Sequence, residues 1–276
     1  MARGISLHLG LNHLDPNHYG GWDGKLNGCE YDAEDLKYLA VEQRFSVYDV
    51  FKSEDAIKEK FTSALQDISK QLTAGDIFLL TFSGHGDQLK DLNNDELDGL
   101  DETWCLYDYE IIDDEIHQLL SLFRAGVRIL ILSDSCHSGT VFKLASHTSL
   151  NDNQNTNTTG TIKCVPKHIS GKIYRHNREY YDKILKDDSL KESRKKIQAS
   201  VRLISACQDN QVAIDLSSNG LFTSTLLDVW DDGWFKGNYR SFYNNIVRKM
   251  PLSQTPKHSL IGPVLPEYNN QKPFKI

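Results

Sequence analysis

The sequence lacks the excess of basic residues that proteins binding nucleic acids typically carry. Among its 276 residues, 31 lysines and arginines are outnumbered by 38 aspartates and glutamates, so the formal net charge is −7. A chain with this balance has no general electrostatic attraction for phosphate backbones. We therefore predict that the protein has no nucleic-acid partner.

Long hydrophobic runs and paired cysteines are also missing. No apolar stretch approaches the ~20 residues that a membrane-spanning helix needs, and residues 1–14 lack the basic and long apolar regions of a secretory signal. The five cysteines are odd in number and form no CxxC pair, which argues against a disulfide framework or a zinc ribbon. These absences predict a soluble, cytoplasmic protein with no membrane partner.

Short apolar segments alternate with amphipathic segments through most of the chain. The apolar segments predict strands at Ile5–Leu11, Ser46–Phe51, Ile77–Phe82, Val127–Leu132, Val201–Ala206 and Ser259–Ile261. Apolar residues at helical spacing predict helices at Tyr31–Phe45, at residues 53–72 with Ser53 as N-cap, and at Asp113–Arg124, Leu221–Trp230 and Tyr239–Met250. This alternation predicts an α/β fold with a mainly parallel central sheet and helices on both faces.

Three segments interrupt the alternation. Residues 87–102 are polar and acidic, which predicts a loop, and residues 172–196 are highly charged, which predicts an exposed helix. Residues 145–162 are rich in Ser, Thr and Asn and have too few apolar residues for a core, so we expect a mobile surface segment. We predict one domain over residues 1–276, in which residues 144–200 are an insertion between a first part (1–143) and a last part (201–276).

Two short motifs follow neighbouring predicted strands: SGHG at Ser83–Gly86 and DSCHSG at Asp134–Gly139. Because the carboxyl ends of parallel strands meet at the same edge of a sheet, we expect His85 and Cys136 to lie close together. An imidazole beside a thiol is the minimum equipment for nucleophilic catalysis by cysteine. The two motifs therefore predict a cysteine hydrolase.

The roles of these residues follow from thiol chemistry. A free cysteine has a pKa of about 8.5, so His85 is expected to accept the proton of Cys136 and later to protonate the leaving amine. The backbone N–H groups of Gly86 and Cys136 are expected to bind the developing oxyanion, a contribution of ~3 kcal/mol per donor in other hydrolases. Each motif by itself also fits a turn or a buried structural cysteine. A zinc site at His85, Cys136 and His137 lacks a fourth ligand at any usual spacing.

Four motifs, in this order, resemble those of the caspase-like cysteine peptidases (clan CD, family C14), and most of all those of metacaspases and their prokaryotic relatives, the orthocaspases. The matching segments span nearly the whole chain: Gly28–Ala33, Ser83–Gly86, Asp134–Gly139, and Ser205–Gln211 followed by Gly220–Thr223. The nucleophile motif differs from the QACxG form of animal caspases, which cut after aspartate. The resemblance implies the caspase-hemoglobinase fold and peptide hydrolysis after Arg or Lys through a thioester intermediate.

The resemblance also implies which residues bind the substrate. In metacaspases the pocket for the basic side chain is lined by residues that match Cys29, Asp32, Ser83 and Asp134. Two carboxylates in a partly enclosed pocket attract a guanidinium or ammonium group and repel an acidic side chain. Asp32 also fits an ordinary role as an acidic residue at a helix N-terminus. We expect Asp209 to add to the acidic rim.

The chemistry requires no cofactor, and the resemblance suggests Ca²⁺ as an activator. Calcium-dependent metacaspases use four aspartates, of which three match Asp101, Asp113 and Asp114, whereas the fourth falls at Lys143. A lysine ammonium disfavours a neighbouring cation, and the two aspartates that start the predicted helix also suit its N-terminus. The acidic segment 91–102 does not fit an EF-hand because Glu96 stands where that loop needs glycine.

Two other functions stay open from the sequence: a caspase-like pseudoenzyme or adaptor that binds basic peptides without cutting them, and a hydrolase of the same fold with a different specificity, such as a legumain-like enzyme. The presence of both His85 and Cys136 favours a peptidase that acts on proteins or peptides with Arg or Lys at the cut. The resemblance implies a monomer. Since no recruitment domain is evident, we expect a separate activating protein.

The composition of the insertion predicts a site at which the protein cleaves its own chain. Mobile polar segments are the preferred targets of proteases. Between residues 143 and 178 lie several side chains of the kind that the acidic pocket accepts: Lys143, Lys163, Lys167, Lys172, Arg175 and Arg178. We expect self-cleavage in this segment, after which the two halves stay together because the predicted strand at Val201–Ala206 supplies core residues.

Overall fold

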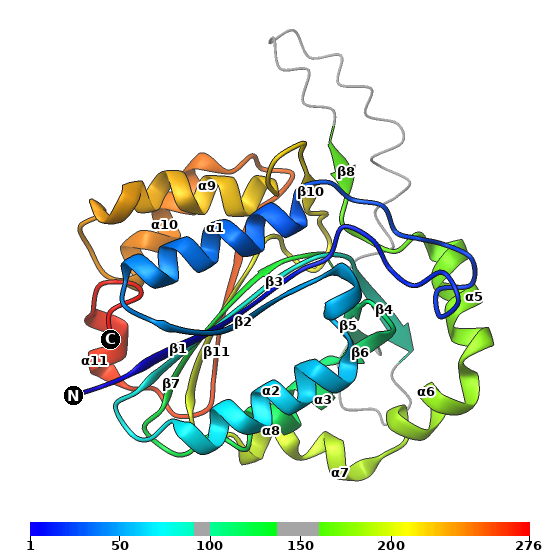
Figure 1. Ribbon diagram of the computed structural model, residues 1–276, viewed down its shortest axis with the longest axis horizontal. Coiled ribbons are helices and arrows are strands. Elements are labelled where there is room, and N and C mark those ends of the chain that lie inside the picture. The colour runs from blue at the N-terminus through cyan, green and yellow to red at the C-terminus, as the bar shows by residue number, and fades with distance from the viewer. Residues whose placement is uncertain (91–99, 137–159) are drawn as a thin grey trace, which may run out of the picture.

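The computed structural model describes residues 1–90, 100–136 and 160–276 (Figure 1). Its central sheet has the strand order β11-β9-β7-β3-β1-β2. These strands are β1 (Gly4–Gly10), β2 (Ser46–Lys52), β3 (Ile77–Ser83), β7 (Arg128–Asp134), β9 (Ser200–Ser205) and β11 (Lys257–Ile261). All neighbours run parallel except β11, which is antiparallel to β9. The mainly parallel sheet is thus confirmed, and strands from both ends of the chain share it.

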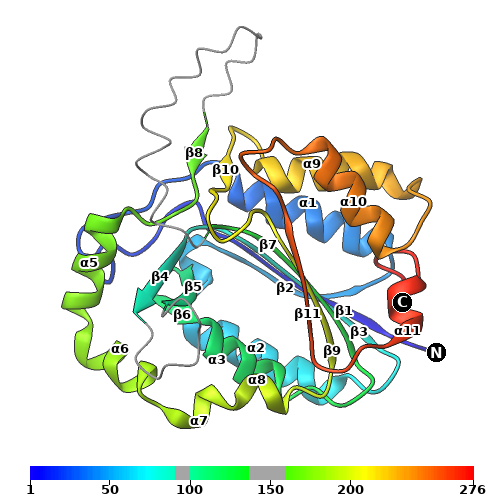
Figure 2. The same ribbon diagram turned by 180° about the vertical axis from the view of Figure 1, so that it is seen from behind.

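Helices cover both faces of the sheet (Figures 1 and 2). On one face lie α1 (Cys29–Glu42), α9 (Leu221–Trp230) and α10 (Tyr239–Lys249), with α11 (Pro266–Asn270) near the chain termini; on the other lie α2 (Lys58–Gln71), α3 (Asp113–Leu120) and α8 (Ser193–Lys196). The prediction of Ser53 as an N-cap is wrong. A short 3-10 turn, η1 (Ser53–Asp55), precedes α2, and the cap position of that helix is Ile57.

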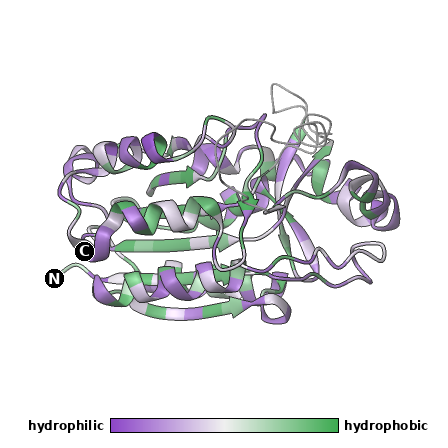
Figure 3. Ribbon diagram, turned by 90° about the horizontal axis from the view of Figure 1, so that it is seen from above, coloured by the Kyte–Doolittle hydropathy of each residue, from purple (hydrophilic) through white to green (hydrophobic). Residues whose placement is uncertain are grey.

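The strand β3 shows why the strands of the central sheet carry apolar side chains on both faces. Its side chains alternate between two cores: Ile77 and Leu79 pack with residues of α1 and α9, whereas Phe78 and Leu80 pack with residues of α2. A parallel strand covered on both faces needs apolar residues at every position. In Figure 3 the hydrophobic colour accordingly runs along the strands between the helices.

A second, smaller sheet extends from the site of the SGHG motif. It consists of the antiparallel strands β4 (Gly86–Lys90), β5 (Leu100–Leu106) and β6 (Tyr109–Ile112). The prediction of a loop over residues 87–102 is therefore wrong at both of its ends, and its residues 91–99 lie outside the described ranges. Its acidic composition suggested solvent exposure, but Asp87 and Asp101 are both buried.

The described part of the insertion is largely structured. Thr161–Ile162 form β8, which pairs with β10 (Ile214–Asp215), and four short helices follow: α5 (Lys167–His176), α6 (Arg178–Leu185), α7 (Asp188–Lys191) and α8. The single exposed helix predicted over 172–196 is thus wrong, because Ile173 and Tyr181 are fully buried. The prediction of a mobile segment over residues 145–162 is wrong at its end, because Thr161–Ile162 form β8. Residues 145–159 of that segment lie outside the described ranges. A 3-10 turn, η2 (Asp231–Gly233), follows α9.

Within the described ranges, no helix combines the length and the hydropathy needed to cross a membrane.

Candidate active site

Two strand ends bring the sequence motifs to one edge of the central sheet. Ser83 ends β3 and Asp134 ends β7, and the two residues are paired directly across the sheet. His85 and Cys136 each follow two residues later. Both side chains are buried, at 3% and 0% exposure. The edge of the parallel sheet thus holds a histidine, a cysteine and an aspartate shielded from solvent.

The hydrogen bonds of His85 define which ring nitrogen is free. Its Nε2 lies 2.9 Å from the carbonyl oxygen of Gly24, and since a carbonyl only accepts, Nε2 carries the proton. Nδ1 is buried and has no hydrogen-bond partner among the described residues. The ring packs against Trp22 at 4.8 Å between centroids. Burial lowers the pKa of His85 to about 4, so the ring is neutral and Nδ1 presents a lone pair.

The thiol of Cys136 is neutral in this arrangement as well. Burial raises the pKa of Cys136 well above its usual value, and the neighbouring thiol of Cys164 adds to the rise. Burial therefore favours the thiol over the thiolate in this arrangement.

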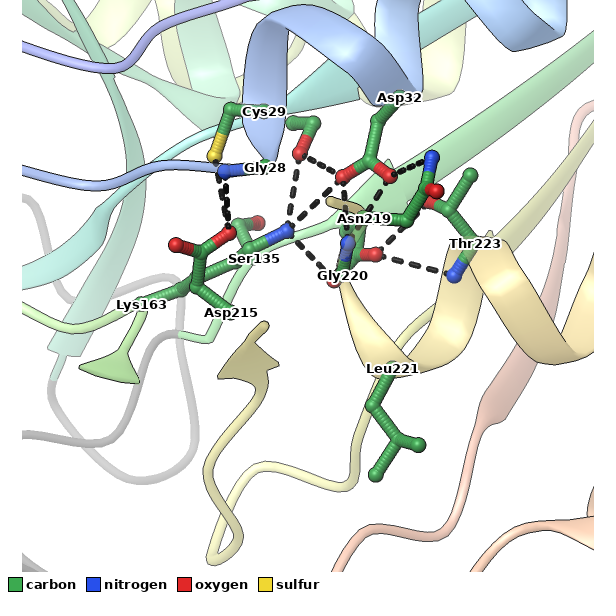
Figure 4. A network of polar contacts seen from close by, with 12 residues as sticks. Gly28, Cys29, Asp32, Ser135, Lys163, Asp215, Asn219, Gly220, Leu221 and Thr223 are labelled. Atoms are coloured by element: carbon green, nitrogen blue, oxygen red, sulfur yellow. Dashed lines mark hydrogen bonds and ion pairs between the residues drawn. The ribbon is translucent and has the colours of Figure 1, made fainter. Parts of the chain in front are cut away.

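Cys29, Asp32, Ser83 and Asp134 surround one buried cationic group, and we call this set of residues the acidic pocket. Figure 4 shows Cys29 and Asp32 in this network of polar contacts. The acidic pocket is occupied by a side chain of the same protein. The ammonium Nζ of Lys163 lies 3.1 Å from Asp32 Oδ2 and 3.2 Å from Asp134 Oδ1, and it donates to Ser83 Oγ at 2.9 Å. Lys163 is fully buried. Burial by itself lowers the pKa of Lys163, but the carboxylates, Asp134 foremost, raise it well above its usual value.

The segment that begins α9 forms one wall of the acidic pocket. Asp134 Oδ2 accepts hydrogen bonds from the backbone N–H and the hydroxyl of Thr223, at 3.0 and 2.8 Å. Asp32 accepts from the backbone N–H of Gly220 at 2.9 Å and from Asn219 Nδ2 at 3.1 Å. A Cβ atom at Gly220 would lie 2.1 Å from Asp134 Oδ2 and 2.3 Å from Lys163 Nζ, so only glycine leaves room for the cation. Burial raises the pKa of Asp32 to about 6, against the opposing effect of Lys163.

A third carboxylate acts on the same lysine, and it is not the one that the sequence suggested. Asp215 accepts hydrogen bonds from the backbone N–H groups of Asn27 and Gly28, and its charge raises the pKa of Lys163. The thiol of Cys29 lies 3.9 Å from Asp215 Oδ1. Asp209, expected at the rim of the pocket, instead forms an ion pair with Lys257 at the surface.

The main chain of Lys163 is held as closely as its side chain. Its carbonyl oxygen accepts from the N–H groups of Gly86 and Cys136, at 3.2 and 3.4 Å, and its own N–H donates to the carbonyl of Ala213 at 2.9 Å. The two donors expected for an oxyanion thus converge on one carbonyl oxygen. On the other side of that carbonyl, Val165 N–H donates to the Gly86 carbonyl at 3.0 Å.

The carboxylates predicted for calcium lie in the smaller sheet and in α3. Asp101 is a buried residue of β5, while Asp113 and Asp114 open α3. In the described part of the chain, no group of three or more His, Cys, Asp or Glu side chains is placed to hold a metal ion. Lys143 and His137 lie outside the described residues.

Several residues of this site escaped the sequence reasoning. Asn219 and Asp215 lie outside the quoted motifs, and Lys163 carried no sign of being buried. Gly220 and Thr223 stood inside a quoted motif without a role. Trp22 and Gly24, which position His85, lie in a glycine-rich stretch whose only signal was its loop character.

Comparison with known proteins identifies the family. Residues 14–273 match the family model of the caspase domain, and the chain belongs to this family. Metacaspase-1 of Schizosaccharomyces pombe is 28% identical over 254 residues, which cover 80% of this chain and 57% of that protein. Metacaspase-1A of Neurospora crassa is 34% identical over 162 residues, covering 52% of this chain and 33% of that protein. The chain thus spans only part of the length of these relatives.

Two solved structures have a similar fold. A crystal structure of a Geobacter sulfurreducens protein is 46% identical, covers 99% of this chain and 98% of its own, and superposes with a TM-score of 0.85. Caspase-1 from Spodoptera frugiperda is 11% identical, covers 95% of this chain and 86% of its own, and has a TM-score of 0.52, which shows a shared fold. The predicted caspase-like fold, close to metacaspases, is confirmed.

Proposed function

We propose that this chain is a cysteine endopeptidase that cuts after Arg or Lys, with Cys136 as nucleophile and His85 as base. One observation carries the proposal. The carbonyl that accepts from the Gly86 and Cys136 N–H groups belongs to a lysine whose ammonium lies between Asp32 and Asp134. The backbone donors expected for an oxyanion and the carboxylates expected for a basic side chain thus contact the same residue, which supports the proposal.

The proposed mechanism uses the ring nitrogen of His85 that has no hydrogen-bond partner among the described residues. Nδ1 of His85 takes the proton of the Cys136 thiol as Sγ attacks the carbonyl carbon. The negative charge that develops on the oxygen is stabilised by the N–H groups of Gly86 and Cys136. His85 then protonates the leaving amine, a thioester remains on Cys136, and water hydrolyses it with His85 again as base.

The proposed preference for basic residues rests on the electrostatics of the acidic pocket. A cation in this buried space is paired with Asp32 and Asp134 and donates to Ser83. An aspartate at the same place would bring a further carboxylate beside Asp32 and Asp134, whose negative charges repel it.

The test uses short fluorogenic peptides that differ only in the residue before the cut: Arg, Lys, Asn or Asp. We expect hydrolysis of the first two only, and none with the Cys136→Ala protein. A basic peptide with a thiol-reactive ketone in place of the cut bond should label Cys136 in the wild-type protein. Labelling or tight binding without turnover would favour a peptide-binding pseudoenzyme, and turnover of the Asn peptide would favour a legumain-like specificity.

The finer statements on partners also belong to this proposal. We propose protein substrates with Arg or Lys at the cut, action as a monomer, control by a separate activating protein, and a cytoplasmic location. Size-exclusion chromatography with light scattering tests the monomer.

A further inference from the structure

One loop of the structure contacts both His85 and the helices of the insertion. It consists of residues 15–24, and we call it the orienting loop. We propose that Tyr181, on α6, is a positioning residue of the peptidase: together with Asn177 it fixes the orienting loop, whose Gly24 carbonyl orients His85. This inference rests on the proposed function, in which His85 is the base.

The orienting loop fixes the ring of His85 through Gly24. The Gly24 carbonyl accepts from Nε2 of His85 at 2.9 Å, which leaves Nδ1 as the nitrogen without a partner among the described residues. Gly24 has a φ of +56°, and a Cβ atom there would lie 2.8 Å from Leu14 Cδ1 and 3.1 Å from His85 Cδ2. The carbonyl therefore reaches the ring only in the conformation that the loop imposes. A base works at full rate only while a third group holds it in place, so a shift of this loop should slow the reaction.

The orienting loop depends on its neighbours for its shape, because residues 11–28 contain no helix or strand. One side is anchored to the end of β5 and the turn after it. The Tyr19 hydroxyl donates to the Leu106 carbonyl at 2.6 Å, and the Asp15 N–H donates to the Tyr107 carbonyl at 2.8 Å. The other side lies beside α5 of the insertion, as Figures 1 and 2 show.

The insertion binds the loop at His18. The hydroxyl of Tyr181, a fully buried residue, lies 2.8 Å from His18 Nε2 and accepts from the Glu110 N–H at 3.2 Å. Asn177, between α5 and α6, donates from Nδ2 to the carbonyls of His18 and Ile173, each at 3.1 Å. His18 is thus held by both its side chain and its main chain. Removal of the Tyr181 hydroxyl would take a partner from two polar groups, His18 Nε2 and the Glu110 N–H.

Direct contacts lead from Tyr181 to His85. The ring of His18 packs edge-on against those of Tyr181 and Tyr19, with centroids 6.0 and 5.0 Å apart. The Tyr19 carbonyl accepts from the Trp22 N–H at 3.2 Å, and the Trp22 ring lies 4.8 Å from that of His85. Close-packed groups of this kind transmit a displacement rather than absorb it. A change at α6 should therefore reach the base.

The test compares wild type, Tyr181→Phe, Asn177→Ala and, as a matched control, Tyr174→Phe. Tyr174 lies on α5, and its hydroxyl donates to Asp182 on α6 rather than to the orienting loop. The kcat for an Arg peptide is divided by the concentration of sites titrated with a thiol-reactive basic ketone, so that misfolded protein does not count. We expect kcat per site to fall about tenfold in Tyr181→Phe and about threefold in Asn177→Ala, with KM nearly constant, because a small misplacement of a catalytic group slows only the chemical step. Tyr174→Phe should match the wild type.

The pH profile separates positioning from general damage. Burial lowers the pKa of His85, and the hydrogen bond to the Gly24 carbonyl opposes this effect. A looser bond should lower the pKa further and move the acid limb of kcat/KM to lower pH in Tyr181→Phe. The charges of Lys163 and Asp23, which also act on His85, are the same in every variant. A profile that is lower at every pH without such a shift would overturn the inference.

A second readout does not depend on activity. The Nε2 proton of His85 is followed by NMR after ¹⁵N labelling of the histidines, and it is assigned by its absence in His85→Gln. Its exchange with water should be about tenfold faster in Tyr181→Phe than in the wild type, since local opening of the loop exposes the proton. Tyr174→Phe should exchange at the wild-type rate.

The outcomes separate this inference from the proposed function. An unchanged exchange rate or an unchanged kcat in Tyr181→Phe overturns the inference and leaves the peptidase standing, and an equal loss of kcat in Tyr174→Phe does the same. A wild-type protein that hydrolyses no peptide overturns the proposed function, and proton exchange at His85 then decides by itself whether Tyr181 holds the loop. If Tyr181→Phe misfolds by circular dichroism, Asn177→Ala is judged by the same measurements.

Discussion

Two clusters of buried carboxyl groups in this molecule differ in what surrounds them. In the acidic pocket, Asp32 and Asp134 receive hydrogen bonds from hydroxyl and backbone donors and ion pairs from Lys163. In the second cluster, Asp87 on β4 and Glu110 on β6 influence each other, but both Glu110 oxygens and one Asp87 oxygen have no hydrogen-bond partner in the described part of the chain. The first cluster is built to hold a cation, and the second is not.

The comparison teaches that burial alone does not make a binding site for a basic group. Burial raises the pKa of Asp87 to about 7 and that of Glu110 well above its usual value, so burial favours the neutral form of both groups. Burial also raises the pKa of Asp32, to about 6, but the hydrogen-bond donors around Asp32 and the ammonium of Lys163 favour its carboxylate form. Directed donors, rather than the number of acids, distinguish the specificity pocket.

The largest expected effect is the loss of the nucleophile. Cys136→Ala should abolish peptide hydrolysis and self-cleavage while leaving the circular dichroism spectrum unchanged, since only one buried sulfur is removed. His85→Ala should lower kcat by at least ~100-fold, the range for loss of a general base. Wild-type rates in the Cys136→Ala protein would redirect the assignment to Cys29 or Cys207.

The second largest effect is expected to differ between the two carboxyl clusters. Asp134→Asn should lower kcat/KM for Arg peptides by about a hundredfold, because removing one partner of a buried charge pair typically costs about 2–5 kcal/mol. Asp32→Asn should act in the same direction. Glu110→Gln, a change of the same size in the other cluster, should leave kcat/KM unaltered. Equal losses in all three variants would mean that the pocket does not act through its charge.

The pH dependence of stability should reveal the second cluster. A carboxyl group whose pKa is raised on folding binds more protons in the native state, so stability falls as pH rises from its unfolded value of 3.8 through about 7 for Asp87. The melting temperature should therefore drop over this window, by roughly 2–4 °C for each kcal/mol lost. Asp87→Asn should flatten the drop. An identical pH profile in that variant would show that Asp87 is ionised throughout.

The last effect is that of calcium, which stays a prediction of the family resemblance. Calcium chloride should raise peptide hydrolysis through Asp101, Asp113 and Asp114, and Asp113→Asn should remove the increase. Calorimetry with calcium chloride measures binding directly. Unchanged hydrolysis in excess chelator together with no binding heat would contradict this role.

Much of the fold was accessible from the sequence for simple reasons. Buried parallel strands such as β3 and β7 need unbroken apolar runs, and amphipathic helices such as α2 carry a stripe that periodicity reveals. The strands β4 and β5 were missed because their acidic residues, which are buried in the structure, give the segment the composition of a solvent-exposed loop. The helices after Lys167 were predicted as one piece, because charge density conceals the few apolar residues that anchor each turn to the core.

By itself, the sequence determined which chemical groups are present and which strand ends carry them. Spacing along the chain was enough to bring Ser83, His85, Asp134 and Cys136 to one sheet edge, since parallel strands share their carboxyl edge. Only the tertiary structure decided that Lys163 fills the acidic pocket and that Asp215, rather than Asp209, is the third carboxylate beside it. Contacts of that kind join residues far apart in the chain, and they depend on how the insertion folds back over the sheet, which no local pattern of residues encodes.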